Sequence, residues 1–291
     1  MRMEWVNALV QGLLLGGLYA LLACGLSLVF GVMRTVNIAH GDLAVFAAFL
    51  GLVVVERTGL HPAVSIVAVV PVMAAAGYAL QRGLLGPALA RGEIAPLLVT
   101  FGLAVVLQNV LQELFSADTQ SLDSGGFATA SLRLTDQLAV GWLPLVTFAV
   151  GVGAVAAVQL VLSRTRLGRA MRATSDDPEA AGLMGIDNRH VYGIATAIAL
   201  ATVGLAGVFL GMRTQFSPTL GPLVLIFAFE AVIIGGLGSL WGTLAGGIVL
   251  GVAQTIGAQV QPAYGVLAGH LVFLVVLGLR PQGLFPRTVT T

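Results

Sequence analysis

The chain has 291 residues, of which 57% are hydrophobic and 9% are charged, and its formal net charge is +1. Because soluble domains carry roughly a quarter charged residues, this composition excludes a water-soluble protein and indicates a polytopic α-helical membrane protein. The near-neutral charge gives no reason to expect a nucleic-acid partner. The single cysteine, Cys24, excludes a disulfide framework and a cysteine metal site.

We expect an all-α integral membrane protein forming one transmembrane domain over residues 1–291, with roughly eight or nine transmembrane helices, some of them broken. Spans follow from the gaps between charged residues, since about 20 apolar residues cross a bilayer. The first gap, 5–33, is longer than one span needs. The next gap, 43–55, is too short to cross at about 1.5 Å per residue.

The segment between these two gaps contains the polar residues Asn37, His40 and Asp42. Irregular backbone at membrane depth is tolerated only where it is covered by protein or lines a cavity, so we expect a broken or re-entrant segment here. Because ionisable groups at that depth are costly, the three residues are candidates for the translocation pathway. The alternative is a position at the membrane interface, with Asp42 capping the short helix that follows. No cluster of potential ligands accompanies His40, so we expect no metal site.

The middle of the chain predicts further spans separated by one long polar stretch. Within the expected span 94–112, Gln108 is either an interhelical hydrogen-bonding residue or a candidate for the pathway. The acidic stretch at about 113–141 is expected to be an external loop. The four spans expected here are 58–81, 94–112, 142–163 and 190–212.

The last part of the chain, 214–279, contains a single charged residue, Glu230. It either pairs with an arginine of another segment or borders the pathway. Glycines at 235, 236 and 238 break any helix, and their density predicts a turn at which segments could shift, so Gly235, Gly236 and Gly238 are candidates for a gate. Four GxxxG pairs favour close helix packing: Gly12/Gly16, Gly207/Gly211, Gly242/Gly246 and Gly247/Gly251. The spans expected here are 219–235, 241–260 and 264–280.

The arginines orient the chain, because cytoplasmic loops carry an excess of basic residues. If the spans alternate sides, ten of the 14 arginines fall on one side, in 31–39, 81–94, 163–190 and 280–291. We therefore expect a multi-pass protein of the bacterial inner membrane with a cytoplasmic C-terminus.

The charged loop at about 163–190 contains a predicted helix outside the membrane. Asp177 can cap it, Pro178 suits its first position and Glu179 favours its positive end. Gly185 can end it in a left-handed conformation. This segment is either an ordinary loop helix or a docking element that fits a groove on a partner. The residues of the predicted contact helix are Asp177, Pro178, Glu179, Ala180, Ala181, Gly182, Leu183 and Gly185.

Four stretches together resemble one known family. The charged loop is similar to the coupling loop of ABC-importer permeases. The opening resembles that of branched-chain amino-acid permeases, in the letters GLYAL at 17–21 running into GVMRTVNIAHGD at 31–42. GGLGSLWG at 235–242, followed by Gly246 and Gly247, is similar to their late glycine-rich segment. RPQGLF at 280–285 resembles their C-terminal ending. The order is the same over nearly the whole chain, and the length resembles that of the shorter of the two permeases.

This resemblance implies a set of partners. Two homologous permeases pair in the bilayer, two cytoplasmic ATPase subunits dock on the coupling helices, and a periplasmic or lipid-anchored binding protein delivers the solute. It also implies that ATP is bound by the partner, so we expect no cofactor and no catalytic residues in this chain. With no lysine, a phosphate loop of the GxxxxGK[ST] type is not possible here.

Two other classes compete with this interpretation. An autonomous secondary transporter or channel usually needs intramembrane charges, and this chain offers few. An intramembrane enzyme needs a nucleophile and base or a metal cluster within the spans, which the sequence does not suggest. The solute is left open, because relatives also carry urea, short amides and other amino acids.

Overall fold

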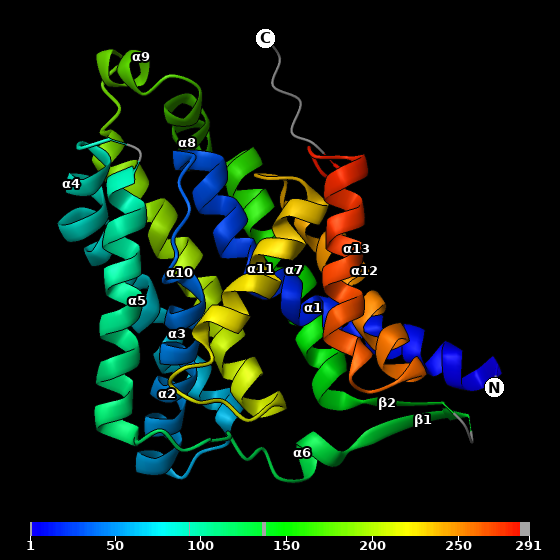
Figure 1. The fold of residues 1–291 in the computed structure, drawn as a ribbon. Coiled ribbons are helices and arrows are strands. Elements are labelled where there is room, and N and C mark those ends of the chain that lie inside the picture. Colours follow the sequence, from blue (N-terminus) through cyan, green and yellow to red (C-terminus); the bar gives the residue numbers. More distant parts are fainter. Residues whose placement is uncertain (1, 93, 136–137, 286–291) are drawn as a thin grey trace.

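The computed structural model describes residues 2–92, 94–135 and 138–285, and this part of the chain is almost entirely helical (Figure 1). The long helices are α1 (Arg2–Met33), α2 (His40–Thr58), α3 (Pro62–Leu80), α5 (Ile94–Phe115), α7 (Trp142–Arg164), α10 (Asn188–Arg213), α11 (Gly221–Gly235), α12 (Leu240–Val260) and α13 (Tyr264–Leu279). The shorter elements are the π-helix η1 (Gln81–Leu85), α4 (Gly86–Leu89), α6 (Gly126–Thr129), β1 (Ser131–Thr135), β2 (Leu138–Gly141), α8 (Arg166–Asp176) and α9 (Pro178–Leu183).

The helices lie where the charge gaps predicted spans, and the protein is a multi-pass membrane protein. Within the described ranges, six helices are long and apolar enough to cross a membrane, and α11 and α13 are shorter apolar helices. α1 and α10 form the centre, with 83% and 72% of their apolar windows buried. In α3, α5 and α7 only 22% of the corresponding window is buried. The apolar side chains that these outer helices expose are suited to contact with lipid.

Glycines allow α1 and α12 to pack with their backbones in contact. Gly12 and Gly16 on α1 face Gly247 and Gly251 on α12. A Cβ atom added to Gly16 would lie 2.8 Å from the carbonyl oxygen of Gly247, and one added to Gly247 would lie 2.8 Å from that of Gly16. Two of the predicted GxxxG pairs therefore pack against each other, which is how small residues bring membrane helices together.

The two central helices are each followed by an extended segment and a helix that starts inside the bundle (Figure 1). After α1, residues 34–39 run back into the bundle before α2 begins. After α10, residues 214–220 do the same from the opposite end before α11 begins. The same three residues, Met-Arg-Thr, stand at 33–35 and at 212–214. In each half of the chain an extended segment therefore separates two helices, an arrangement that resembles the discontinuous helices of transporters.

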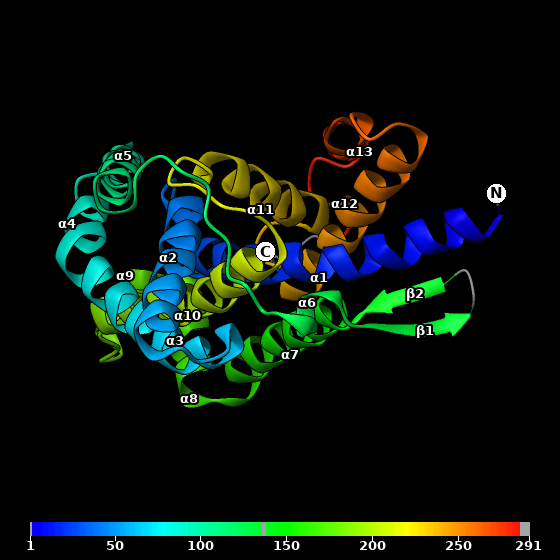
Figure 2. The same cartoon turned by 90° about the horizontal axis from the view of Figure 1, so that it is seen from below.

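The loops gather at the two ends of the bundle as the arginine pattern predicted. α8, α9, the end of α1 and the last described residues share one end (Figure 1). The polar stretch 113–141 lies at the other end, apart from 136–137, which fall outside the described residues. The fold departs here from the all-α expectation, because β1 and β2 form an antiparallel hairpin. The hairpin lies beside the first half of α1 (Figure 2), where Gln11 Nε2 donates to the carbonyl oxygen of Ala139 at 3.1 Å.

Candidate translocation pathway and coupling helix

The first turns of α2 and α11 pack against each other. A Cβ atom added to Gly41 would lie 2.7 Å from the backbone nitrogen of Leu225, so only glycine allows this approach. The Asp42 side chain lies against Gly221, the first residue of α11. The positive ends of two helices therefore meet within the bundle, with one carboxylate beside both.

Each polar residue predicted in the re-entrant segment is buried and hydrogen-bonded. Asn37 Oδ1 accepts from the backbone nitrogen of Ala39 at 3.0 Å. His40 Nε2 donates to the carbonyl oxygen of Leu22, on α1, at 2.8 Å. These bonds replace the helical bonds that an extended segment lacks, which is the requirement for irregular backbone in a membrane protein.

The Asp42 side chain bonds to α5 and does not cap α2. Its Oδ1 accepts from Gln108 Nε2 at 2.8 Å, and Asp42 itself is 2% exposed. The residue that precedes α2 is Ala39, with no side-chain cap, so the predicted capping by Asp42 is wrong. The backbone nitrogen of Ile38 also donates to Thr100 Oγ1 of α5 at 3.1 Å. α5 thus fixes the re-entrant segment at two points.

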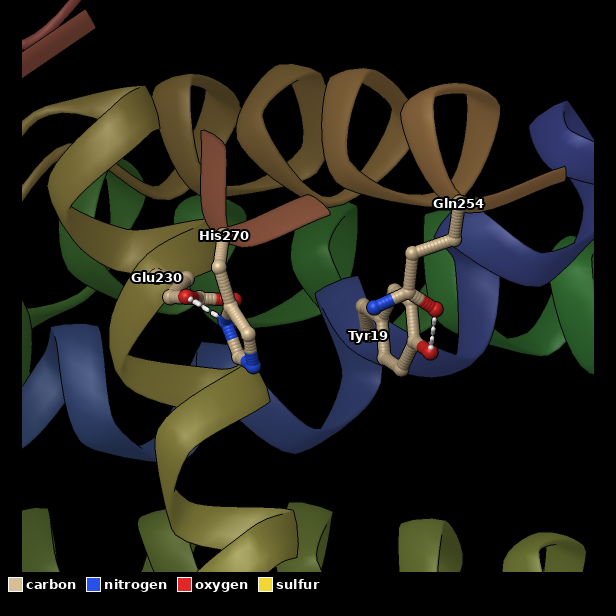
Figure 3. A network of polar contacts seen from close by, with 4 residues as sticks. All are labelled: Tyr19, Glu230, Gln254 and His270. Carbon is tan, nitrogen blue, oxygen red and sulfur yellow. Dashed lines mark hydrogen bonds and ion pairs between the residues drawn. The ribbon is translucent and has the colours of Figure 1, made fainter. Parts of the chain in front are cut away.

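Glu230 of α11 finds its partner on the last helix. Its Oε1 accepts from His270 Nδ1 of α13 at 2.5 Å (Figure 3). The partner is therefore a histidine, not the arginine considered from the sequence. The His270 ring also stacks on Phe227, with centroids 6.2 Å apart. This pair ties α11 to α13.

A second polar pair lies beside the first. The Tyr19 hydroxyl of α1 donates to Gln254 Oε1 of α12 at 2.5 Å (Figure 3). The Tyr19 and Phe227 rings are 5.3 Å apart, so an aromatic line connects the two pairs. Three buried atoms around them have no hydrogen-bond partner among the described residues: Glu230 Oε2, Gln254 Nε2 and Arg213 Nη1. These groups complement a zwitterionic solute: the carboxylate oxygen can accept from an ammonium group, and the amide and guanidinium nitrogens can donate to a carboxylate.

The glycine-rich turn after α11 is packed by the end of the chain. Gly236 and Gly238 adopt φ of 108° and 78°, which only glycine takes readily. The backbone nitrogens of Leu284 and Phe285 donate to the carbonyl oxygens of Ile234 and Gly235 at 2.8 and 3.0 Å. Two motifs that the sequence placed about 40 residues apart therefore form one junction.

The contact helix forms as its capping residues predicted. Asp177 Oδ1 accepts from the backbone nitrogens of Glu179 and Ala180 at 2.9 and 3.0 Å, and Pro178 takes the first position. Gly185 follows the helix with φ of 83°. The preceding arginine-rich segment is itself a helix, α8, which the sequence analysis did not identify. Its signal was Thr165, whose hydroxyl accepts from the backbone nitrogen of Gly168 at 3.0 Å as an N-cap.

The outward face of α9 is apolar at its end. Leu183 and Met184 are 90% and 84% exposed. Ala181, which was expected at the contact, is instead buried at 4% exposure and packs inward. Gly182 is exposed, with Asn188 Nδ2 3.8 Å from the position of a Cβ atom. Any docking contact made by this helix therefore centres on Leu183 and Met184 rather than on Ala181.

In the residues that the structure describes, no group of three His, Cys, Asp or Glu side chains could hold a metal ion. Of the titratable groups, His270 and Tyr19 belong to a polar network that the sequence did not predict. A single histidine inside an apolar run gives no signal of its own, since its partner lies on another helix.

Comparisons with known proteins agree on one family. A family model described as the branched-chain amino acid transport system / permease component matches residues 8–277. The chain is 31% identical over 300 residues to the high-affinity branched-chain amino acid transport system permease protein BraD of Pseudomonas aeruginosa, covering 98% of this chain and 96% of BraD. It is 28% identical to the corresponding permease protein LivH of Escherichia coli K12, covering 97% and 96%.

Among solved structures, the fold is similar to a chain of PsaBC from Streptococcus pneumoniae in complex with Fab. The TM-score is 0.50 and the identity is 17%, with 97% of each chain covered. At that identity the likeness concerns the fold alone.

Proposed function

Because the chain belongs to the family of branched-chain amino acid transport system permease components, we propose that it is the permease subunit of an ATP-binding-cassette importer for branched-chain amino acids or related small polar solutes. It is not an enzyme in this proposal. Hydrolysis of ATP belongs to a separate subunit, and this chain forms one side of the pathway through the membrane.

The observation that carries the proposal is the contact helix α9. Apolar side chains as exposed as Leu183 and Met184, at the end of a capped helix outside the bundle, are suited to a groove on a partner. The arginines of α8 on the same side support placing this end and the C-terminus in the cytoplasm. The partner proposed for this surface is the ATP-hydrolysing subunit, one for each of two paired permeases.

The segment that carries α8 and α9 is hydrogen-bonded to both central helices, so a movement imposed by the ATPase could be transmitted to the pathway. Asn188, the first residue of α10, donates from Nδ2 to the carbonyl oxygen of Pro178 at 2.6 Å. Its Oδ1 accepts from Thr174 Oγ1 of α8 at 3.0 Å. On the other side, Ser175 Oγ donates to the carbonyl oxygen of Gly31 near the end of α1 at 2.8 Å. A push on α9 would therefore displace α1 and α10 together.

Both central helices lead directly into the re-entrant junction. A displacement of α1 and α10 would reach the extended segments and the contact between Gly41 and Gly221. We place the pathway beside this junction. The residues proposed to line it are Asn37, His40 and Asp42 at and just before the start of α2, Gln108 on α5 and Glu230 on α11. Gly235, Gly236 and Gly238 would absorb the backbone rotations at the gate.

The remaining partners follow from the same assignment. A second, homologous permease would complete the pathway in the bilayer, and a solute-binding protein would deliver solute at the face that carries the hairpin. This face is external in the proposed orientation.

Copurification with ATPase subunits tests the proposal. The tagged chain, expressed with the ATPase subunits of a branched-chain amino-acid importer of its own organism, is expected to retain them through purification. Retention should be lost when Leu183 and Met184 are both changed to Glu. A wild-type chain that is folded but retains no ATPase would contradict the proposal.

A further inference from the structure

A cavity of about 290 Å³ lies between α1, α7, α8 and the start of α12. No residue of the polar network of Figure 3 or of the re-entrant segment lines it, and the glycine-rich turn borders it through Gly238. Its polar lining residues are Ser27, Gln159, Ser163, Arg172 and Ser239. Its apolar lining residues include Leu28, Val32, Leu162, Met171, Leu240 and Trp241.

One lining group, the Ser27 hydroxyl, is buried without a hydrogen-bond partner among the described residues. Ser27 is 1% exposed. A buried hydroxyl without a hydrogen-bond partner is unfavourable, so we expect a partner inside the cavity. At about 290 Å³ the cavity offers much more space than one bridging water needs.

The other polar groups select an anion. Among the described lining residues, the charged side chain is Arg172, and none is acidic. Its Nη1 donates to the carbonyl oxygen of Leu162, which fixes the guanidinium and leaves its other N–H groups available. The cavity also receives the start of α12, where Ser239 Oγ accepts from the backbone nitrogen of Gly242 at 3.2 Å. The first N–H groups of such a helix favour a negative charge.

The apolar half of the lining selects a lipid over a small ion. Leu28, Val32 and Leu162 would be covered by the upper part of an acyl chain, whereas a free phosphate would leave them bare. Trp241 is 51% exposed at the mouth, and tryptophan favours the level of the lipid headgroups. Arg164 and Arg166 are exposed next to the cavity and would attract anionic lipid to it.

We propose that this cavity is a binding site for the phosphate group of an anionic phospholipid, held by Arg172, Ser27 and the N-terminus of α12. Bound there, the lipid joins α8 to α1 and α12. It is a structural lipid of the loop that carries α9, and its binding does not depend on transport.

Native mass spectrometry of the purified protein in detergent tests this site. Phosphatidylglycerol, phosphatidylcholine and inorganic phosphate are the probes. We expect phosphatidylglycerol to bind and phosphatidylcholine to bind more weakly, and Arg172→Gln to weaken phosphatidylglycerol binding about tenfold. Arg169→Gln removes the same charge from the exposed face of the same helix and is expected to leave binding within about twofold.

Ser27→Ala provides a second measurement, should Arg172→Gln prevent folding. It removes only the unpaired hydroxyl and is expected to weaken binding about threefold or more. Equal binding of the two lipids, or equal effects of Arg172→Gln and Arg169→Gln, would overturn the proposal. Displacement of phosphatidylglycerol by millimolar phosphate would assign the cavity to a soluble anion and would also overturn it.

Discussion

Asn188, at the start of α10, donates a hydrogen bond from its side chain to the carbonyl oxygen of Pro178, the first residue of α9, at 2.6 Å. The exposed helix that is suited to docking is thus attached directly to one of the two most buried helices of the bundle. A force applied to α9 would reach the re-entrant junction through this bond and α10.

Changing Leu183 and Met184 to Glu should abolish ATPase docking without unfolding the permease, because both side chains are exposed. Loss of an apolar anchor typically costs about 2 kcal/mol or more, which is about 30-fold in affinity for each of the two. Pull-down of the ATPase measures this directly. Leu132→Glu, on the hairpin at the opposite end, is the matched control and should retain the ATPase. Equal loss in the control would show that the effect is not specific to α9.

Replacing Asn188 with Ala should uncouple hydrolysis from transport. The change removes the bonds to Pro178 and Thr174 but leaves the exposed face of α9 in place, so the ATPase should still dock. We expect ATP hydrolysis by the complex to persist while leucine uptake in proteoliposomes falls about tenfold. Arg189→Ala, at the next and exposed position, should leave both activities near the wild type. Parallel loss of hydrolysis and uptake in Asn188→Ala would contradict a transmitting role.

Gln108→Leu should destabilise the protein, because it removes the side-chain donor to the buried Asp42 carboxylate. Losing a hydrogen bond to a charged group costs about 1.5–3 kcal/mol, and unfolding in detergent measures the difference. Asn109→Leu is the control, since Asn109 is exposed and bonds only within its own helix, to Val105 at 2.7 Å. Asp42→Asn in the Gln108→Leu background should recover part of the loss. If both single variants were equally stable, α5 would not be fixing the re-entrant segment.

Glu230 and His270 should show energetic coupling, because one short hydrogen bond joins them. Glu230→Ala, His270→Ala and the double variant form a cycle, with an expected interaction energy of about 0.5–3 kcal/mol in unfolding measurements. A control cycle pairs His270→Ala with Asn109→Ala, on a helix that shares no partner with it, and should be additive within about 0.5 kcal/mol. An additive result for Glu230 and His270 would mean that the pair does not hold α13 against α11.

The sequence predicted helices well because charge marks their ends. The last predicted span, 264–280, differs by one residue from α13, Tyr264–Leu279, since Arg280 cannot continue into lipid. The contact helix was equally predictable, because Asp177, Pro178 and Gly185 are local signals whose partners lie within a few residues.

Long-range pairing was not predictable. Glu230 and His270 are 40 residues apart and Tyr19 and Gln254 are 235 apart, so neither pair leaves a local pattern. The inward orientation of Ala181 depends on how α9 packs against its neighbours, which its sequence does not specify. The hairpin of β1 and β2 was missed because a polar stretch between spans looks the same whether it is extended or irregular.

Uptake into proteoliposomes tests the central claim most directly. Vesicles would contain the chain with its homologous permease, with or without the ATPase subunits, and radiolabelled leucine would be supplied with its binding protein. We predict uptake only when the ATPase subunits and ATP are both present, with none above empty vesicles when either is omitted. Leucine uptake by the permeases alone, unaffected by ATP, would contradict the assignment and identify the chain as an autonomous transporter.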